Sequence, residues 1–171
     1  MDEWQITPLT HEHDRSQFGC GHPTLDRFLK DFARQNQDRD VNRTFVLVQK
    51  HDARVYGYYT LAAGQIERTS LPPKLSKKLP RYPVPVAVLG RLAVEATLKG
   101  QKLGRMLLWD ALNRCLAASD VAPGGLGIFA VFVEAIDGPA IEFYRHFGFE
   151  PLVDSTDKLF LPLSVIRKFR K

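Results

Sequence analysis

The sequence predicts an α/β fold in which a mixed, mostly antiparallel sheet is flanked by helices. Two β-rich runs, residues 44–48 and 55–61, are separated by a short polar turn, which is typical of an antiparallel hairpin. A strand–helix–strand succession follows over residues 86–133, and such a crossover joins parallel strands. The two central strands are therefore expected to be parallel. A chain of 171 residues has the length of one domain, which we expect to cover residues 1–171.

Composition narrows the class of protein. Hydrophobic residues make up 44% of the chain and charged residues 25%, as in globular proteins and unlike disordered tails. No apolar run approaches the roughly 20 residues that span a bilayer, and the acidic start of the chain does not resemble an export signal. Cys20 and Cys115 form no CxxC pair and are expected to be reduced thiols. We therefore expect a cytoplasmic protein without membrane association.

The net charge of +5 gives a first indication of function. An excess of lysine and arginine favours an anionic partner, either a nucleic acid or a phosphate-bearing cofactor. The alternative is that the charge serves solubility alone.

The first half of the chain is predicted to contain a strand at residues 4–9 and a helix that opens at Pro23, both before the hairpin. Apolar residues at spacings of three and four form the inward face of this helix: Leu25, Phe28, Leu29 and Phe32. After the hairpin, closely spaced prolines predict that residues 71–85 form a surface loop with neither regular helix nor central strand. The basic side chains of this loop either contact a polyanion or are simply solvated.

The second half is predicted to alternate strands and helices. A buried strand, a long helix, a second buried strand, a short helix and two closing strands are expected, in this order, at residues 86–94, 103–118, 128–133, 140–147, 150–153 and 158–161. A glycine-rich turn over residues 124–127 precedes the second buried strand, and Gly148 is expected to end the short helix. Residues 167–171 form a basic tail.

A glycine-bearing turn between the first buried strand and the long helix is a candidate anion site. It reads Lys99-Gly100-Gln101-Lys102-Leu103-Gly104-Arg105. Such a turn exposes backbone N–H groups without intrahelical partners at the positive end of the helix dipole, which suits a pyrophosphate. Three cationic side chains, Lys99, Lys102 and Arg105, reinforce the site. The alternative is an ordinary helix start with solvated lysines, since a short glycine turn is a weak motif.

Motifs along nearly the whole chain carry a family resemblance. Besides this turn they are Phe18 to Gly21, Leu25-Asp26 with Phe28-Leu29, Gly57 to Leu61, Leu89-Gly90-Arg91-Leu92-Ala93-Val94, Phe143-Tyr144, Phe147-Gly148-Phe149 and Leu159 to Leu163. In this order they resemble the GNAT superfamily of acyl-CoA-dependent N-acetyltransferases. Within it, the resemblance is closest to the TacT-like toxins of bacterial toxin–antitoxin pairs.

The resemblance implies a GNAT-like fold with acetyl-CoA in the gap between two splayed parallel strands. Backbone groups of Leu92, Ala93 and Val94 would pair with the pantetheine arm like an added strand. The pyrophosphate would bind the glycine-bearing turn, through the amides from Gly100 to Arg105. Lys102 departs from the family pattern, which has a glycine there. A lysine is costly if the position needs a positive φ, unless its ammonium group gains a phosphate contact.

For the chemistry, the resemblance implies that Tyr144 protonates the sulfur of CoA as the thioester breaks. A phenol with a pKa near 10 is protonated at neutral pH and can donate that proton. The residues alone favour a core aromatic, because Tyr144 shares a helical face with Phe143 and Phe147. A backbone N–H of Leu92–Val94 could polarise the carbonyl group. Glu95 is a candidate general base, with a solvated carboxylate at the strand end as the alternative.

The substrate class of the TacT-like branch is aminoacyl-tRNA, which carries an α-amine on a polyanion. An α-amine has a pKa near 8, against about 10.4 for lysine, so it needs no strong base near neutral pH. Arg91 and the basic residues of the predicted helix and loop would then contact tRNA phosphates: Lys30, Arg34, Lys74, Lys77, Lys78 and Arg81.

The resemblance further implies a homodimer and a small antitoxin, of the ribbon-helix-helix type, as partners. Two alternatives stay open: acetylation of a small amine or of a protein N-terminus, and a non-catalytic module that binds CoA or a partner protein. No metal is expected, because His11 and His13 lack a third ligand.

Overall fold

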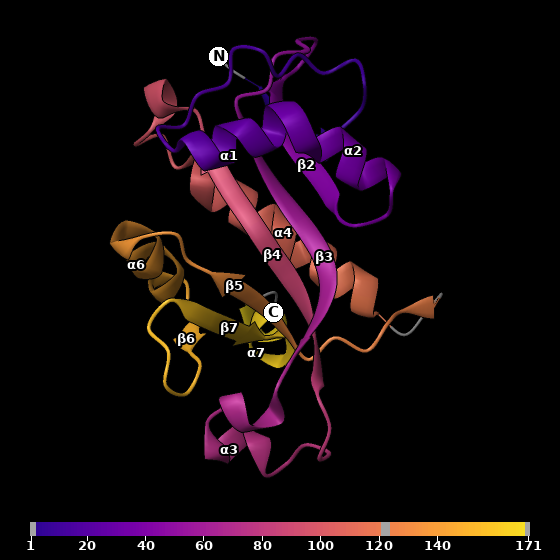
Figure 1. Cartoon of the computed structure of the whole chain (residues 1–171), viewed down its shortest axis with the longest axis vertical. Helices are drawn as coiled ribbons and strands as arrows, with labels where there is room; N and C mark the ends of the chain where they lie inside the picture. Colours follow the sequence, from indigo (N-terminus) through magenta and orange to yellow (C-terminus); the bar gives the residue numbers. More distant parts are fainter. Residues whose placement is uncertain (1–2, 121–123, 170–171) are drawn as a thin grey trace. The chain divides into compact units, whose positions relative to one another are not determined.

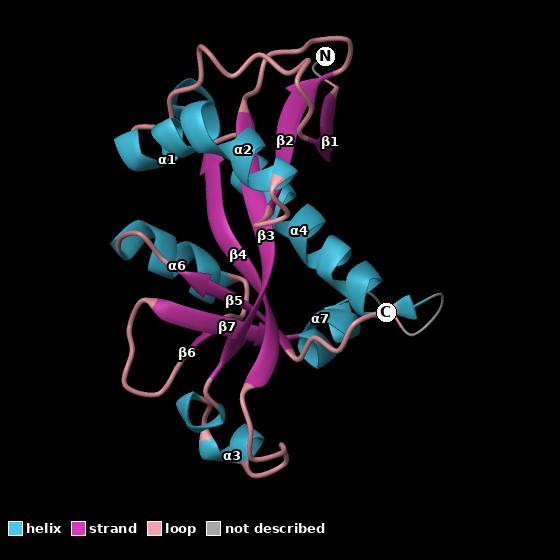
Figure 2. Ribbon diagram, turned by 45° about the vertical axis from the view of Figure 1, so that its right-hand side comes forward, coloured by secondary structure: helices cyan, strands magenta, loops and turns pink. Residues whose placement is uncertain are grey.

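A computed structural model of the chain describes residues 3–120 and 124–169 (Figures 1 and 2). Within these residues seven strands form one sheet in the order β1-β2-β3-β4-β5-β7-β6. The strands are β1 (Trp4–Pro8), β2 (Arg43–Gln49), β3 (Gly57–Ile66), β4 (Val84–Val94), β5 (Ala130–Glu134), β6 (Glu150–Pro151) and β7 (Lys158–Pro162). The α-helices are α1 (Pro23–Arg27), α2 (Ala33–Asp38), α3 (Pro73–Ser76), α4 (Leu103–Ser119), α6 (Gly138–His146) and α7 (Leu163–Phe169). In this part of the chain no helix has the length and apolar character of a membrane span.

The chain divides into two compact units. The first comprises Met1–Ala62 and Gly90–Ala111, and the second comprises Ala63–Leu89 and Leu112–Lys171. The long elements β3, β4 and α4 are each divided between the two units. One GNAT domain over residues 1–171 stays a prediction.

In the first unit an antiparallel sheet is covered on both faces. β1 pairs with β2, and β2 pairs with β3 from Arg43↔Leu61 to Leu47↔Gly57, which confirms the predicted hairpin. The next two residues of β3 point to opposite faces, as strand geometry requires. The Tyr58 hydroxyl donates to the Leu25 carbonyl of α1 (2.7 Å), and the Tyr59 hydroxyl donates to Asp110 of α4 (2.6 Å). Figure 1 accordingly shows α1 in front of these strands and α4 behind them.

The helix predicted from Pro23 continues to Asp38 but is interrupted by a π-helical turn at Phe28–Phe32. The Ala33 N–H donates to the carbonyl of Phe28, five residues earlier. This wider winding moves the inward position from Phe32, which is 41% exposed, to Ala33, which is fully buried. The prediction that Phe32 faces the core was wrong, because a 3.6-residue period does not hold across a π turn.

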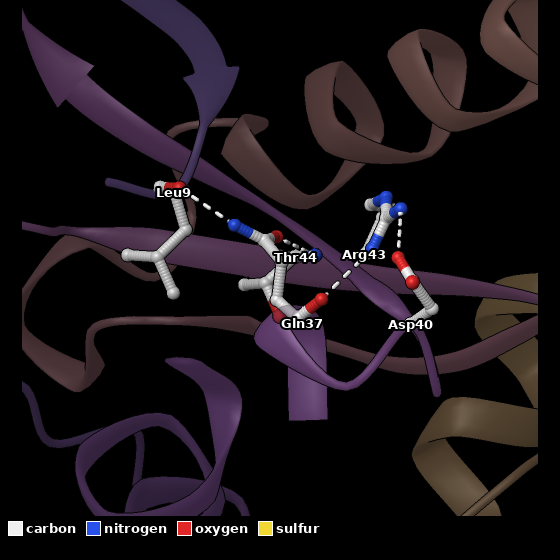
Figure 3. A network of polar contacts seen from close by, with 5 residues as sticks. All are labelled: Leu9, Gln37, Asp40, Arg43 and Thr44. Carbon is white, nitrogen blue, oxygen red and sulfur yellow. Dashed lines mark hydrogen bonds and ion pairs between the residues drawn. The ribbon is translucent and has the colours of Figure 1, made fainter. Parts of the chain in front are cut away.

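The side chain of Gln37 fastens the end of α2 to the adjoining ends of β1 and β2 (Figure 3). Its amide NH₂ donates to the Leu9 carbonyl (2.8 Å), and its amide oxygen accepts from the Thr44 N–H (3.0 Å). The Arg43 guanidinium donates to the Gln37 carbonyl (3.0 Å) and pairs with Asp40 (2.6 Å). The Gln37 amide therefore extends the hydrogen-bond ladder between the two strands.

In the second unit β4 and β5 pair in parallel from Val86↔Ala130 to Leu89↔Val133. β7 pairs antiparallel with both β5 and β6. The predicted mixed, mostly antiparallel sheet with one parallel pair is confirmed. Cys115 is buried and free, as is Cys20 in the first unit.

The prediction that residues 71–85 contain neither helix nor strand was wrong at both ends of the segment. Pro73 is the first residue of α3, where a proline is tolerated because the first helical N–H has no acceptor within the helix. β4 already begins at Val84, and Pro85 lies one residue inside it with an exposed side chain. The Pro85 carbonyl accepts from the Phe129 N–H (2.9 Å).

The basic tail predicted at residues 167–171 largely belongs to α7. Arg167 and Lys168 lie in the last turn of this helix, where the dipole favours cations. Residues 170–171 lie outside the described part of the chain.

Close packing at Gly57 allows a test of the first unit. A Cβ atom on Gly57 would lie 3.0 Å from the Ala93 carbonyl oxygen and 3.2 Å from a methyl carbon of Leu107. Gly57→Ala is therefore expected to lower the free energy of unfolding by about 1–3 kcal/mol, measured by urea denaturation. Gly19→Ala is the matched control, because no atom lies within 4 Å of its added Cβ. Equal effects of the two substitutions would contradict this packing.

Candidate active site

The last residues of β4 present backbone groups at a defined edge. The Glu95 N–H, directly after the strand, donates to the Tyr56 carbonyl (2.8 Å), on the side of β4 where β3 lies. Backbone groups of successive strand residues point to opposite edges, so those of Ala93 also face β3. The Ala93 carbonyl oxygen does lie against Gly57 of β3. The N–H and C=O groups of Leu92 and Val94 consequently face the edge away from β3.

This edge is where the parallel partner stops pairing. The last registered pair with β5 is Leu89↔Val133, and β4 continues beyond it to Val94. An extended ligand at this edge would meet the backbone of Leu92 and Val94. The backbone of Ala93, predicted with them, is turned to β3 instead.

The candidate phosphate turn has the backbone geometry of an anion site. After a single 3₁₀ turn at Ala96–Leu98, Gly100 adopts φ +88° and Lys102 adopts φ +63°. α4 begins at Leu103, and its first-turn N–H groups have no acceptors within the helix. Lys102 thus occupies the left-handed region, which costs a side-chain-bearing residue about 1–2 kcal/mol. The family's inner glycine has its physical reason in this φ angle.

Most side chains of the turn are open to solvent. Lys99, Gln101, Lys102 and Arg105 are exposed, whereas Leu103 is buried. The Lys99 ammonium nitrogen lies 3.7 Å from the position of a Cβ on Gly21. The turn is further braced by the Ala96 N–H, which donates to the Gly19 carbonyl (2.8 Å).

Glu95 has a structural role at the end of β4. It is only 5% exposed, so the expectation of a solvated carboxylate was wrong. The Arg54 guanidinium bonds its Oε2 at 2.8 Å and lies 4.8 Å from the centre of the Tyr56 ring. Burial of a carboxylate is costly unless a cation compensates it, and Arg54 provides that charge. The pair fixes the end of β4 directly before the phosphate turn, and one oxygen of the candidate base is already engaged.

Tyr144 lies on α6, in the second unit. This helix begins at Gly138 rather than at the predicted residue 140, because the Asp137 carboxylate caps it by accepting from the Ala140 N–H (2.9 Å). Gly148, with φ +94°, allows the chain to turn after the helix, as predicted.

The Tyr144 ring is closely packed, and its hydroxyl forms no hydrogen bond with the residues that the structure describes. The rings of Phe143 and Phe149 each lie 5.3 Å from it, and the residue is 7% exposed. Burial raises the pKa of the Tyr144 phenol well above its ordinary value, so the phenol is protonated at neutral pH. Over residues 3–120 and 124–169 no group forms a hydrogen bond with its hydroxyl. Tyr144 can therefore both pack in the core through its ring and donate a proton through its hydroxyl.

The predicted phosphate-contacting residues fall in both units. In the first unit Lys30 is exposed, Arg34 forms a 3.8 Å ion pair with Asp38, and Arg91 is half-buried over the ring of Phe28. In the second unit Lys77, Lys78 and Arg81 are exposed, and Lys74 pairs with Glu150 at 3.8 Å.

His11 and His13, the two histidines considered as metal ligands, do not form a metal site. The Nδ1 atom of His13 accepts from the Thr10 N–H (2.9 Å), and His11 is exposed. Within the described ranges no group of three or more potential ligand residues could hold a metal ion.

Sequence reasoning missed two partnerships in the site. Arg54 lies 41 residues before Glu95, and Arg91 lies 63 residues after Phe28. Both pairs join residues on different elements, for which a single sequence carries no spacing signal.

Comparison with known proteins identifies the family. The model of the Acetyltransferase (GNAT) family matches residues 7–149. The tRNA-acetylating toxin of Mycobacterium tuberculosis is 39% identical over 155 residues, which cover 91% of this chain and 88% of the relative.

Solved structures of toxins share the fold. AtaT complexed with acetyl-methionyl-tRNAfMet matches with a TM-score of 0.90 and 34% identity, over 99% of this chain and 100% of that one. AtaTR bound with acetyl-CoA matches with a TM-score of 0.85 and 34% identity, over 98% of each chain. Similar structures also include AtaT bound to the C-terminus of the antitoxin AtaR, a KacTA–DNA complex, and tyrosine-to-phenylalanine variants of KacT and AtaT. The chain therefore belongs to the GNAT family of acetyltransferases.

Proposed function

We propose that this protein is the toxin of a toxin–antitoxin pair, which transfers the acetyl group of acetyl-CoA to the α-amine of aminoacyl-tRNA and so blocks translation. The observation that carries the proposal is the match, over nearly the full length of both chains, to AtaT complexed with acetyl-methionyl-tRNAfMet. The name of the mycobacterial relative, tRNA-acetylating toxin, supports the same acceptor.

Acetyl-CoA supplies an activated acetyl thioester, and the first unit has the groups to hold it. Leu92 and Val94 would pair with its extended arm at the edge away from β3, and one of their N–H groups would polarise the thioester carbonyl. The backbone from Gly100 to Arg105 would bind the pyrophosphate, with Lys99 and Lys102 adding charge. The left-handed turn and the start of α4 directly after it, at Leu103, fit this role.

The proposed transfer needs one proton donor from the protein. The neutral amine attacks the thioester carbon, the C–N bond forms, and the C–S bond breaks as Tyr144 gives its proton to the departing sulfur. The proton lost by the amine passes to water. Because an α-amine has a pKa near 8, it needs no buried base, which agrees with the engagement of Glu95 by Arg54.

The basic residues are proposed to contact tRNA phosphates. Arg91, Lys30 and Arg34 would do so from the first unit, and Lys77 and Lys78 from the second. We further propose a homodimer, an antitoxin of the ribbon-helix-helix type, and action in the cytoplasm, where charged tRNA occurs. The complexes of AtaT with AtaR and of KacTA with DNA support an antitoxin partner.

The acceptor is tested by incubating the protein with labelled acetyl-CoA and, separately, aminoacyl-tRNA, deacylated tRNA, peptides or polyamines. Label is expected on aminoacyl-tRNA alone, and mild base should release it as N-acetyl amino acid. Deacylated tRNA is the matched control, since it has the same phosphates without the amine. Label on polyamines or peptides alone would contradict the proposal and favour a small amine or a protein N-terminus as acceptor.

Tyr144→Phe removes the proposed proton donor and keeps the ring. We expect kcat to fall about 100- to 10,000-fold, while KM for acetyl-CoA changes less than about twofold. In the unmodified protein, the raised pKa of Tyr144 predicts no loss of kcat through its deprotonation up to about pH 10. An unchanged kcat in the variant would assign Tyr144 to core packing only.

Two substitutions separate the strain at Lys102 from its charge. Lys102→Gly removes both, so it should raise the free energy of unfolding by about 0.5–1 kcal/mol and raise KM for acetyl-CoA several-fold. Lys102→Gln keeps the side-chain strain, so it should raise KM similarly without the gain in stability. A lower KM for acetyl-CoA in Lys102→Gly would show that the ammonium makes no phosphate contact.

A further inference from the structure

A column of stacked side chains in the first unit supports Arg91. The carbon at the centre of its guanidinium lies 3.6 Å from the centre of the Phe28 ring. Phe28 stacks on Tyr58, with ring centres 6.1 Å apart and planes 18° from parallel, and Tyr58 meets the edge of Phe18 at 5.7 Å. The three rings are 5% exposed or less, so the column is part of the core. Only its last member, Arg91, is partly open to solvent.

The π-helical turn fixes the ring of Phe28. Groups from outside the helix hold this turn: the Arg15 guanidinium donates to the carbonyls of Leu29 (2.9 Å) and Lys30 (3.4 Å). One turn earlier, the Tyr58 hydroxyl donates to the Leu25 carbonyl (2.7 Å). Single π turns are uncommon and occur often at functional sites. Here the turn sets the platform on which Arg91 lies.

The Arg91 charge has no carboxylate partner in the part of the chain that the structure describes. Burial lowers the pKa of its guanidinium, and the nearby Tyr58 phenol counteracts part of this effect. Stacking uses the plane of a guanidinium and leaves the N–H groups at its rim free for a fork-shaped contact with a phosphate. A fixed, unpaired arginine of this kind is prepared for an anion.

The position of Arg91 indicates which anion. It directly precedes Leu92, one of the two residues whose backbone would bind the cofactor at this edge. An amine that attacks the thioester there must come from the end of the acceptor, and the fixed charge next to an aminoacyl ester on RNA is the phosphodiester of the last nucleotides. Lys30, which is exposed, and Arg34, which is half-buried, lie after Phe28 on the helical segment that carries this ring, where they suit more distant phosphates.

We propose that Arg91 binds a phosphodiester near the 3′ end of the acceptor RNA, and that Phe28, held by the π turn, is a positioning residue that fixes the guanidinium for this contact. The inference rests on the proposed function, because it requires an RNA acceptor. It gives the π turn a role in substrate recognition rather than in packing alone.

The test uses the variants Arg91→Gln, Arg91→Lys and Phe28→Leu. Arg39→Gln is the control, because it also removes one positive charge, but from an exposed residue directly after α2. Arg91→Gln should raise KM for aminoacyl-tRNA about tenfold or more and leave KM for acetyl-CoA unchanged. The slope of log(kcat/KM) against log[salt] should become shallower by roughly 0.7–0.9, the loss of one phosphate contact. For Arg91→Lys, KM for aminoacyl-tRNA should lie between the values of the unmodified protein and of Arg91→Gln, because lysine keeps the charge without the planar fork. The control should change neither KM.

Phe28→Leu should raise KM for aminoacyl-tRNA about threefold or more with KM for acetyl-CoA and the salt slope unchanged, because the charge remains. If that variant does not fold, Arg91→Gln decides alone. An unchanged KM for aminoacyl-tRNA in Arg91→Gln would overturn this inference and leave the proposed function standing. A raised KM for acetyl-CoA in Arg91→Gln would also overturn it, by assigning Arg91 to the cofactor. Failure of the unmodified protein to label aminoacyl-tRNA would instead reject the proposed function itself.

Discussion

The alternating direction of backbone groups along the end of β4 is the constraint on which the candidate site depends. The hydrogen bond from Glu95 to Tyr56 fixes which residues face β3, and the neighbours Leu92 and Val94 then face the other edge. A shift by one residue would exchange the two sets, so this register must be held firmly. The ion pair of the buried Glu95 carboxylate with Arg54 and the close packing of Gly57 against Ala93 both hold it. Two features that bind no ligand thereby determine where a ligand can bind.

The phosphate turn shows how charge and strain are combined at one position. The left-handed backbone at Lys102 favours glycine. A side chain at this position lowers the stability of the folded protein by about 1–2 kcal/mol. A cation at this place stands beside the first-turn amides of α4, so the same residue that strains the turn adds to its attraction for anions. The stack under Arg91 follows a similar logic, since a rare helical turn is retained where it fixes a charged group.

Local pattern predicted much of this structure, and long-range pairing accounts for what it missed. The hairpin of β2 and β3, the parallel β4–β5 pair and the turn at Gly100–Arg105 followed from alternation, crossover length and glycine placement. The exposure of Phe32 could not be predicted from the helical period. It follows from the π turn, where Arg15 and Tyr58, both outside the helix, donate hydrogen bonds to carbonyls of the turn and of the residues before it. Likewise, the ion pair of Glu95 depends on a turn 41 residues earlier in the chain. Short helix α3 formed despite its prolines, because one of them begins it.

Amide hydrogen exchange with and without coenzyme A tests the central claim most directly, because side-chain substitutions leave backbone donors in place. Binding is predicted to slow exchange at Leu92 and Val94 and at the first-turn amides of α4, Gly104 and Arg105. Exchange at Ala93 and Glu95, whose N–H groups face β3, should stay as it was. Slowing at Ala93 without Leu92 and Val94, or saturation with coenzyme A that protects none of these amides, would contradict the backbone-held cofactor.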